Sequence, residues 1–276
     1  MDFLKQKIVT IEGLDYWIEI GKRLTEHMNY RKGTKVLDIG TGGGACLLPA
    51  AKMIGAEGKA IGIDLWKNSK KETMENAKKN GLENISVQIM DARKITFEES
   101  TFDYVVSGFI GLNQIYDFQK NEYRTENTIM NNIHRILKSN GKIGISTWLK
   151  QGELDHLREL IQNYLKNHSK ASQYEIESVP TSYSKEHLQG VEKLLKDAGF
   201  QNIRILVEDF VLKYQSVDEW FKMMRRVGWI LEKTFNKDEK LIQDFKEKML
   251  PKGIEIYWKD DGYYFTKSVI FAFGLK

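Results

Sequence analysis

The residues best suited to chemistry in this chain are acids and glycines that follow short apolar segments. Asp38 lies in the first such segment, 35–40, and a run of small residues comes next: Gly40, Thr41, Gly42, Gly43, Gly44 and Ala45. Glycine adopts positive φ angles and has no Cβ, so a ligand can lie against the bare backbone of this loop. A helix is expected from about Cys46, and its first N–H groups and partial positive charge would face the loop. The loop is therefore expected to bind an anionic group, either a phosphate or a carboxylate.

Two more acids end the next apolar segments and narrow the choice of ligand. Asp64 lies near the end of the segment 60–65, twenty residues after Gly44. A carboxylate at this position accepts hydrogen bonds from a ribose diol. Asp91 closes the segment 85–91, where it can accept from an adenine amino group. The two acids together indicate a ligand that carries a nucleoside.

Asp38 separates two classes of nucleoside ligand. Its charge, two residues before the first glycine, would face the pyrophosphate of a dinucleotide, but it can accept from an ammonium group. Ribose, adenine and an amino-acid zwitterion together describe S-adenosylmethionine. A dinucleotide remains the alternative, because Gly40, Gly42 and Ala45 match the fingerprint G-x-G-x-x-G/A literally.

The elements that must position these residues alternate along the chain. Five segments are short, rich in Val and Ile and bounded by Gly or Asp, as strands are: 35–40, 60–65, 85–91, 102–109 and 141–148. Helical patterns lie between them at 45–55, 67–81 and 126–141, the last closing on Gly141 as its C-cap. Such alternation indicates βαβ units around a parallel sheet with helices on both faces. Ligands bind such sheets beyond the carboxyl ends of the strands, which is where the acids lie.

Beyond Trp148 the alternation loosens. Helical patterns are expected at 152–168 and 184–200. Long strands are expected at 203–214 and 264–275, and we interpret these two as an edge pair.

Composition limits the class of protein. The chain has 276 residues, 41% of them hydrophobic, which is enough for one large α/β core with a cap. A formal charge of +4 is too thin to indicate nucleic-acid binding. The single cysteine, Cys46, excludes a disulfide framework and a cysteine-based zinc site, and suits a reducing cytosol. Without a visible signal peptide or a membrane-spanning run, we expect a cytoplasmic monomer or homodimer with no metal site.

Four motifs occur in the order and with the spacing of a known family across about residues 34–148. They read "VLDIGTGGG", "GKAIGIDL", "VQIMDARKITFEESTFDYVVSGF" and "IHRILKSNGKIGIST", and the weaker "LLKDAGFQNIRI" extends the match to roughly residue 205. With these motifs the chain resembles the class I S-adenosylmethionine-dependent methyltransferases. It is most similar to the small-molecule group that includes the ubiquinone and menaquinone enzymes, with a methyltransferase type 11 domain.

The resemblance implies a fold and a role for each motif. The fold would be a Rossmann-like, seven-stranded, doubly wound α/β sheet with an antiparallel last strand, in a three-layer sandwich with helical cap insertions. The glycine loop and Asp38 would hold the methionine end of the cofactor, Asp64 the ribose and Asp91 the adenine amino edge. The implied cofactor-binding residues are Asp38, Gly40, Thr41, Gly42, Gly44, Asp64, Leu65, Asp91, Ala92, Ser107, Gly108 and Phe109.

No pattern marks a catalytic side chain. Methyl transfer from a sulfonium chiefly needs proximity and alignment, and a general base matters only if the acceptor carries a proton to lose. Tyr116 and Asp117, just after the fourth strand segment, and His187, in the cap region, are the candidate bases. Aromatic residues such as Trp17 and Trp220 either pack a lid or line a pocket for a flat acceptor or an amine, and the sequence leaves both possibilities open.

We therefore expect an enzyme that transfers the methyl group of S-adenosylmethionine to O, N or C of a small molecule by direct displacement and releases S-adenosylhomocysteine. Residues 1–33 would form an N-terminal helical cap, 34–149 the cofactor-binding core, and 150–276 the rest of the sheet, with cap insertions at about 150–190 and 215–262. The alternatives are an NAD-dependent oxidoreductase, a catalytically silent cofactor-binding module, and an RNA or protein methyltransferase.

Overall fold

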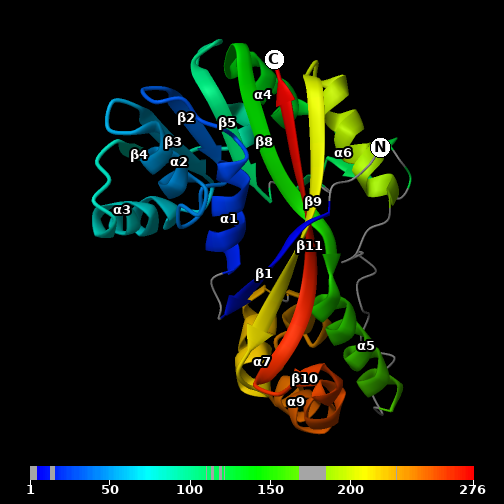
Figure 1. The fold of residues 1–276 in the computed structure, drawn as a ribbon. Coiled ribbons are helices and arrows are strands. Elements are labelled where there is room, and N and C mark those ends of the chain that lie inside the picture. The colour runs from blue at the N-terminus through cyan, green and yellow to red at the C-terminus, as the bar shows by residue number, and fades with distance from the viewer. Residues whose placement is uncertain are drawn as a thin grey trace.

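A mixed β-sheet runs through the whole molecule (Figure 1). The computed structural model describes residues 5–12, 16–109, 111–112, 115–117, 120, 122–167, 185–227 and 229–276. The strands of this sheet are β1 (Lys5–Glu12), β2 (Lys35–Ile39), β3 (Lys59–Asp64), β4 (Ile85–Ile89), β5 (Phe102–Gly108), β8 (Leu137–Gln151), β9 (Gln201–Tyr214), β10 (Trp258–Lys259) and β11 (Gly262–Leu275). Their order is β1-β9-β11-β8-β5-β2-β3-β4, with β10 paired to β11. Two short strands, β6 (Tyr116–Asp117) and β7 (Glu122–Tyr123), pair separately.

The central part of this sheet has the expected doubly wound topology. Strands β4, β3, β2, β5 and β8 run parallel, and β11 lies antiparallel between β8 and β9. The seven strands from β4 to β9 therefore confirm the predicted seven-stranded sheet with an antiparallel last strand. The order reverses between β2 and β5, and this switch point is where such sheets bind ligands.

Helices cover both faces of the sheet and make three layers (Figure 1). The helices are α1 (Tyr16–Glu26), α2 (Leu47–Ile54), α3 (Ser69–Lys79), α4 (Thr128–Ile136), α5 (Gly152–Lys166), α6 (Lys185–Asp197), α7 (Val217–Val227), α8 (Trp229–Thr234) and α9 (Glu239–Gly253), with short 3₁₀ turns at Ala92–Lys94 and Glu255–Tyr257. Within β2, Val36 packs into the core under α1 and α2, whereas Leu37 and Ile39 pack into the core under α4 and α6. Such strands are buried on both faces, which explains why they read as continuous apolar runs.

The three longest strands, β8, β9 and β11, continue past the core into a second lobe (Figure 1). Helices α5, α7 and α9 pack there, around the ends of these strands. Trp220 stacks on Phe265 with ring centroids 5.6 Å apart, and Tyr257 stacks on the same ring at 4.4 Å. Trp220 and Phe265 therefore belong to the hydrophobic core of this lobe, and Tyr257 packs against it.

A buried ion pair lies where the two lobes meet. Lys267 of β11 and Glu153 at the start of α5 have no exposed side-chain surface, and Nζ lies 2.7 Å from Oε1. The ammonium also lies 4.5 Å from the ring centroid of Trp148 and 5.0 Å from that of Tyr16. The negative charge of Glu153 is favoured by its place in the first turn of a helix.

Three local expectations are corrected by the structure. The helix expected at 126–141 ends at Ile136, because Leu137 is extended and pairs with Phe102; Gly141 therefore lies inside β8 rather than at a C-cap. The strands at 203–214 and 264–275 do pair, but they are not an edge pair, since β1 covers β9 in parallel register. Residues 1–33, expected to be helical, thus contribute this edge strand as well as α1. The segment 168–184 of the expected cap lies outside the described residues.

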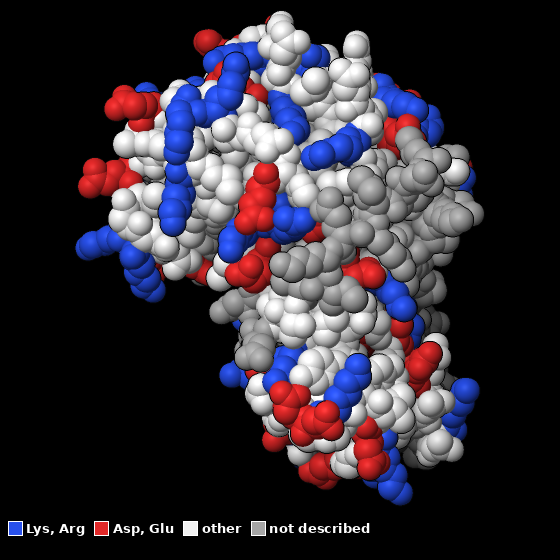
Figure 2. Space-filling model, viewed as in Figure 1, with Lys and Arg blue, Asp and Glu red and all other residues white. Residues whose placement is uncertain are grey.

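Charge is mixed over the surface. On the face in Figure 2, Lys and Arg side chains are interspersed with Asp and Glu side chains over both lobes. Among the described residues, no helix combines the length and the apolarity needed to cross a bilayer.

Candidate active site

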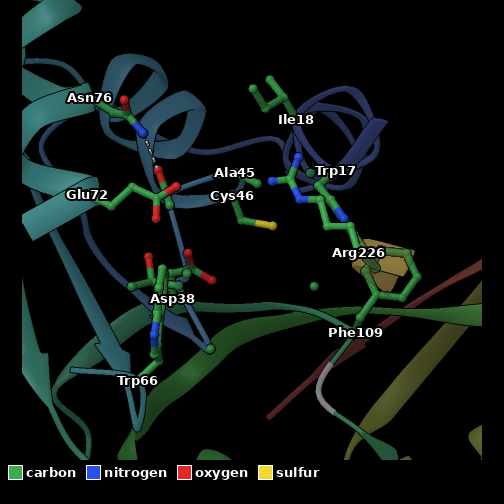
Figure 3. Close-up of a pocket in the computed structure, with 16 residues that line it drawn as sticks. Trp17, Ile18, Asp38, Ala45, Cys46, Trp66, Glu72, Asn76, Phe109 and Arg226 are labelled. Carbon is green, nitrogen blue, oxygen red and sulfur yellow. Dashed lines mark hydrogen bonds between the residues drawn. The ribbon is translucent and has the colours of Figure 1, made fainter. Parts of the chain in front are cut away.

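A pocket of about 340 Å³ opens at the carboxyl ends of β2 and β5 (Figure 3). The glycine loop forms its floor, and α1, α3 and α7 supply its walls. The lining residues are Trp17, Ile18, Gly21, Asp38, Gly40, Thr41, Gly42, Gly43, Ala45, Cys46, Trp66, Glu72, Asn76, Gly108, Phe109 and Arg226. The pocket thus coincides with the switch point of the sheet, and half of the predicted cofactor-binding residues line it: Asp38, Gly40, Thr41, Gly42, Gly108 and Phe109.

The glycine loop is an open cradle. Gly40 and Gly42 have φ angles of +74° and +51°. Apart from their chain neighbours, no described residue has an atom within 4 Å of the place where a Cβ would stand on either of them. Helix α3 holds the loop from behind, because Thr73 donates a hydrogen bond to the carbonyl of Gly42 and Asn76 donates one to that of Gly43. A ligand can therefore lie against fixed backbone at Gly40 and Gly42, as the residue types predicted.

Helix α2 begins at Leu47, close to the predicted start at about Cys46, and Cys46 is its N-cap. No side chain caps this end, so its first N–H groups and the helix dipole favour an anionic group near the loop. Burial raises the pKa of the Cys46 thiol, which is therefore neutral at physiological pH.

Asp38 is a buried carboxylate that accepts no hydrogen bond of normal geometry from the residues that the structure describes. Its side chain is 1% exposed, and neither oxygen accepts a hydrogen bond of normal geometry, although Thr41 and the Leu47 amide lie near it. Burial, and after it the charge of Asp64, raises the pKa of Asp38 to about 7. An uncompensated carboxylate at the wall of a pocket is stabilised by a cationic ligand group.

Asp64 supports the glycine loop from the end of β3. Its two oxygens accept hydrogen bonds from the amides of Gly42 and Trp66, each over 2.8 Å. Asp64 itself does not line the pocket. Leu65, expected against the adenine, is 62% exposed and is also outside the lining, where Trp66 stands instead.

The other predicted cofactor residues, Gly44, Asp91, Ala92 and Ser107, are not in the lining of the pocket. The Asp91 carboxylate accepts from the amide and guanidinium of Arg93, next to Ala92 in a 3₁₀ turn. The Ser107 hydroxyl is fully buried and donates to the carbonyl of Ile39 over 2.6 Å, which ties β5 to β2. Gly44 has a φ of +92° and packs against helix residues behind the loop.

One wall of the pocket is aromatic. Phe109, which has a φ of +58°, stacks on Trp148 with ring centroids 4.2 Å apart. Trp17 of α1 meets Phe109 edge-on at 4.8 Å and Tyr16 at 4.7 Å. Trp17, one of the aromatic residues noted in the sequence, thus lines the pocket together with Phe109, which directly follows β5.

Helix α1, which carries Trp17, is attached to the sheet by a buried acid. Glu208 of β9 is 2% exposed and accepts hydrogen bonds from Arg23 over 2.6 and 3.0 Å. His27 lies 2.8 Å from the same carboxylate. Burial opposes the ionisation of Glu208, but its hydrogen bonds to His27 and Arg23 outweigh burial and lower its pKa. The wall formed by α1 is therefore held by a charge network.

Three polar pocket residues were not predicted: Glu72, Asn76 and Arg226. Glu72 and Asn76 come from α3, on the side of the pocket opposite Arg226, which enters beside Trp17 from α7 of the second lobe (Figure 3). The sequence pattern of α3 gives a solvated lysine-rich helix, and nothing in the sequence brings residue 226 next to the glycine loop. A contact between residues so far apart in the sequence can be recognised only in the three-dimensional structure.

The three candidate bases do not line the pocket. Tyr116 and Asp117 form the short strand β6, where Asp117 makes an ion pair with Arg124 over 2.6 Å. His187 on α6 is 2% exposed, and burial lowers its pKa to about 4. The titratable side chains that line the described pocket are Asp38, Cys46, Glu72 and Arg226, so a catalytic role for the three candidates stays a prediction.

Comparison with known proteins agrees with this geometry. A family model described as a methyltransferase domain matches residues 30–181. The aklanonic acid methyltransferase DauC of Streptomyces sp. (strain C5) is 38% identical over 97 residues, 35% of this chain but only 44% of that protein. A demethylmenaquinone methyltransferase of Anoxybacillus flavithermus is 28% identical over 193 residues, 67% of this chain and 77% of that protein. The crystal structure of the YcgJ protein of Bacillus subtilis shares the fold, with a TM-score of 0.57 at 17% identity over 95% of this chain and 98% of that one.

Proposed function

We infer that this chain, which belongs to the methyltransferase domain family, transfers the methyl group of S-adenosylmethionine to a small-molecule acceptor. Bound S-adenosylmethionine supplies an electrophilic methyl group on a sulfonium with a thioether as leaving group. An O, N or C nucleophile of the acceptor displaces the thioether directly, and the product is S-adenosylhomocysteine. The names of the two relatives, an aklanonic acid methyltransferase and a demethylmenaquinone methyltransferase, support a small-molecule acceptor.

One observation carries the choice of cofactor: Asp38 is buried at the open glycine loop, and none of the described residues donates it a hydrogen bond of normal geometry. The ammonium of a methionine moiety compensates this carboxylate, whereas the pyrophosphate of NAD would add negative charge beside it. Gly40 and Gly42 give the room that such a ligand needs. The residues present thus fit S-adenosylmethionine.

The acceptor would bind at the side of the pocket formed by the aromatic wall. Trp17 and Phe109 present apolar surface that removes water from the reacting atoms and aligns a small molecule with the methyl group. Alignment of this kind supplies about 7–11 kcal/mol of a displacement barrier. The reaction therefore does not depend on a catalytic base unless the acceptor must lose a proton.

The remaining assignments belong to the same proposal. Asp64 would share its carboxylate between the loop amides and the ribose hydroxyls, and Asp91 would meet the adenine. Trp66 replaces Leu65 as the apolar surface offered to the adenine. A core at 34–149 with caps before and after it, a cytoplasmic location, a monomer or homodimer, and an acceptor other than nucleic acid complete the proposal.

A methyl-transfer screen tests the proposal. The full chain is incubated with S-adenosylmethionine and pools of phenols, quinols, amines and carboxylates, and S-adenosylhomocysteine is measured by mass spectrometry. We expect acceptor-dependent product with at least one pool, and its loss in the Asp38→Asn variant. Cofactor binding without transfer to any acceptor indicates a silent module, and transfer to RNA or protein alone rules out the small-molecule assignment.

A further inference from the structure

The pocket is lined by charged side chains of both signs. Of its lining residues, the charged ones are Asp38 at the loop, Glu72 on α3 and Arg226 on α7. Arg226 stands in the last turn of α7 and belongs to the second lobe, well outside the 30–181 segment that matches the family model. The family match therefore assigns no role to this arginine.

These charges complement an amino-acid zwitterion. Asp38 is buried, accepts no hydrogen bond of normal geometry from the described residues, and is suited to an ammonium group. A carboxylate on the same carbon atom would be disfavoured near Asp38 or Glu72, and is favoured near a guanidinium. Arginine offers a planar pair of N–H donors that matches a carboxylate.

We propose that Arg226 of the second lobe binds the carboxylate of the cofactor's methionine end while Asp38 binds its ammonium, so that the cofactor is held between the two lobes. This assignment rests on the proposed function. It makes Arg226 a cofactor-binding residue supplied by a cap helix, in addition to those of the glycine loop.

The geometry of α7 supports this assignment. The neighbouring residues Trp220, Met223 and Met224 are fully buried in the second lobe, so the helix that carries Arg226 has a fixed place. In Figure 3 the arginine enters the pocket beside Trp17, opposite Glu72, so that cationic and anionic side chains occupy different walls. The cofactor thereby couples α7 to the glycine loop of the core.

The competing holder of the carboxylate is the uncapped start of α2, which also favours an anion. An affinity cycle with two ligands separates the two possibilities. S-adenosylhomocysteine carries the amino-acid group, whereas 5′-methylthioadenosine keeps the adenosine and the sulfur but lacks that group. Isothermal titration calorimetry on the full chain measures both ligands with the wild type, Arg226→Gln and Arg226→Lys.

Arg226→Gln is expected to lower the affinity for S-adenosylhomocysteine by about tenfold to a hundredfold, the usual effect of losing a hydrogen bond to a charged group. The affinity for 5′-methylthioadenosine should change by less than about twofold, and Arg226→Lys should recover part of the loss because it restores the charge. Lys222→Gln is the matched control, since Lys222 is exposed on the same helix and does not line the pocket.

Unchanged affinity for S-adenosylhomocysteine in Arg226→Gln would overturn the assignment and leave the start of α2 to hold the carboxylate. Equal losses for both ligands would also overturn it, because the arginine would then act on the adenosine part or on the fold. A wild-type chain that binds neither ligand would refute the proposed function itself, and with it this assignment.

Discussion

Replacing Asp38 by asparagine removes a buried charge and keeps the shape of the side chain. Burial raises the pKa of Asp38 to about 7, about three pH units above that of a free aspartate. Such a difference corresponds to about 4 kcal/mol of unfolding free energy that the ligand-free protein gives up when Asp38 is ionised. We therefore expect the ionised Asp38 to lower the unfolding free energy of the ligand-free wild type and to favour binding of a cationic group.

The pH dependence gives the sign and the size of the effect. Between about pH 4 and about pH 7 the folded protein holds a proton on Asp38 that the unfolded chain has lost, so the unfolding free energy falls as the pH rises. The slope is about 1.4 kcal/mol per pH unit, and it vanishes above about pH 7. Relative to Asp38→Asn, the wild type should lose about 2 kcal/mol between about pH 5.5 and about pH 8.

Urea unfolding of both proteins at these two pH values measures this difference. The quantity compared is the change in unfolding free energy between the two pH values in each protein. The cost of burying the asparagine amide does not depend on pH and therefore cancels. Groups that titrate elsewhere contribute equally to both proteins. The variant should also bind S-adenosylhomocysteine more weakly, because the ammonium loses a charged acceptor. A wild type and a variant with the same pH dependence would refute the reasoning, since Asp38 would then not carry a buried titration.

Three further substitutions test other parts of the structure. Asp64→Ala should weaken S-adenosylhomocysteine binding by about 1–3 kcal/mol, because the ribose and the loop amides both lose an acceptor; unchanged affinity by calorimetry in a folded variant would reject this role. Glu208→Gln should lower the unfolding free energy by about 2–3 kcal/mol, because Arg23 keeps its charge but loses its partner, and urea unfolding that matches the wild type would contradict the network. Lys267→Met should lower the unfolding free energy by about 3–5 kcal/mol, because it leaves the buried charge of Glu153 without its partner. The double variant with Glu153→Leu should lose much less. Equal decreases in melting temperature in the two variants would argue against the ion pair.

The parts of the fold that local pattern determines were predicted well. Strand segments near Asp38, Asp64 and Gly108 read correctly, because a strand buried on both faces is a continuous apolar run that ends where the chain turns. The start of α2 was also predicted, since few residues before Pro49 can begin a helix. The glycine loop then followed from residue type alone.

The parts that depend on distant partners could not be read from the sequence. Strand β1 exists because it pairs with β9, about two hundred residues later in the chain. Leu137 reads as helix by periodicity, but its pairing with Phe102 makes it strand. Arg226 lines the pocket beside Trp17, although more than two hundred residues separate the two in the sequence. The site therefore divides into a floor that the sequence predicts and walls that tertiary packing supplies.

The central claim is that the loop with Asp38 binds an amino-acid zwitterion joined to adenosine rather than a pyrophosphate. Calorimetric titration of the full chain with S-adenosylhomocysteine and, separately, with NAD tests it most directly. We predict saturable binding of S-adenosylhomocysteine at one site per chain, weakened in Asp38→Asn, and no measurable heat with NAD. Saturable binding of NAD with no binding of S-adenosylhomocysteine would contradict the account.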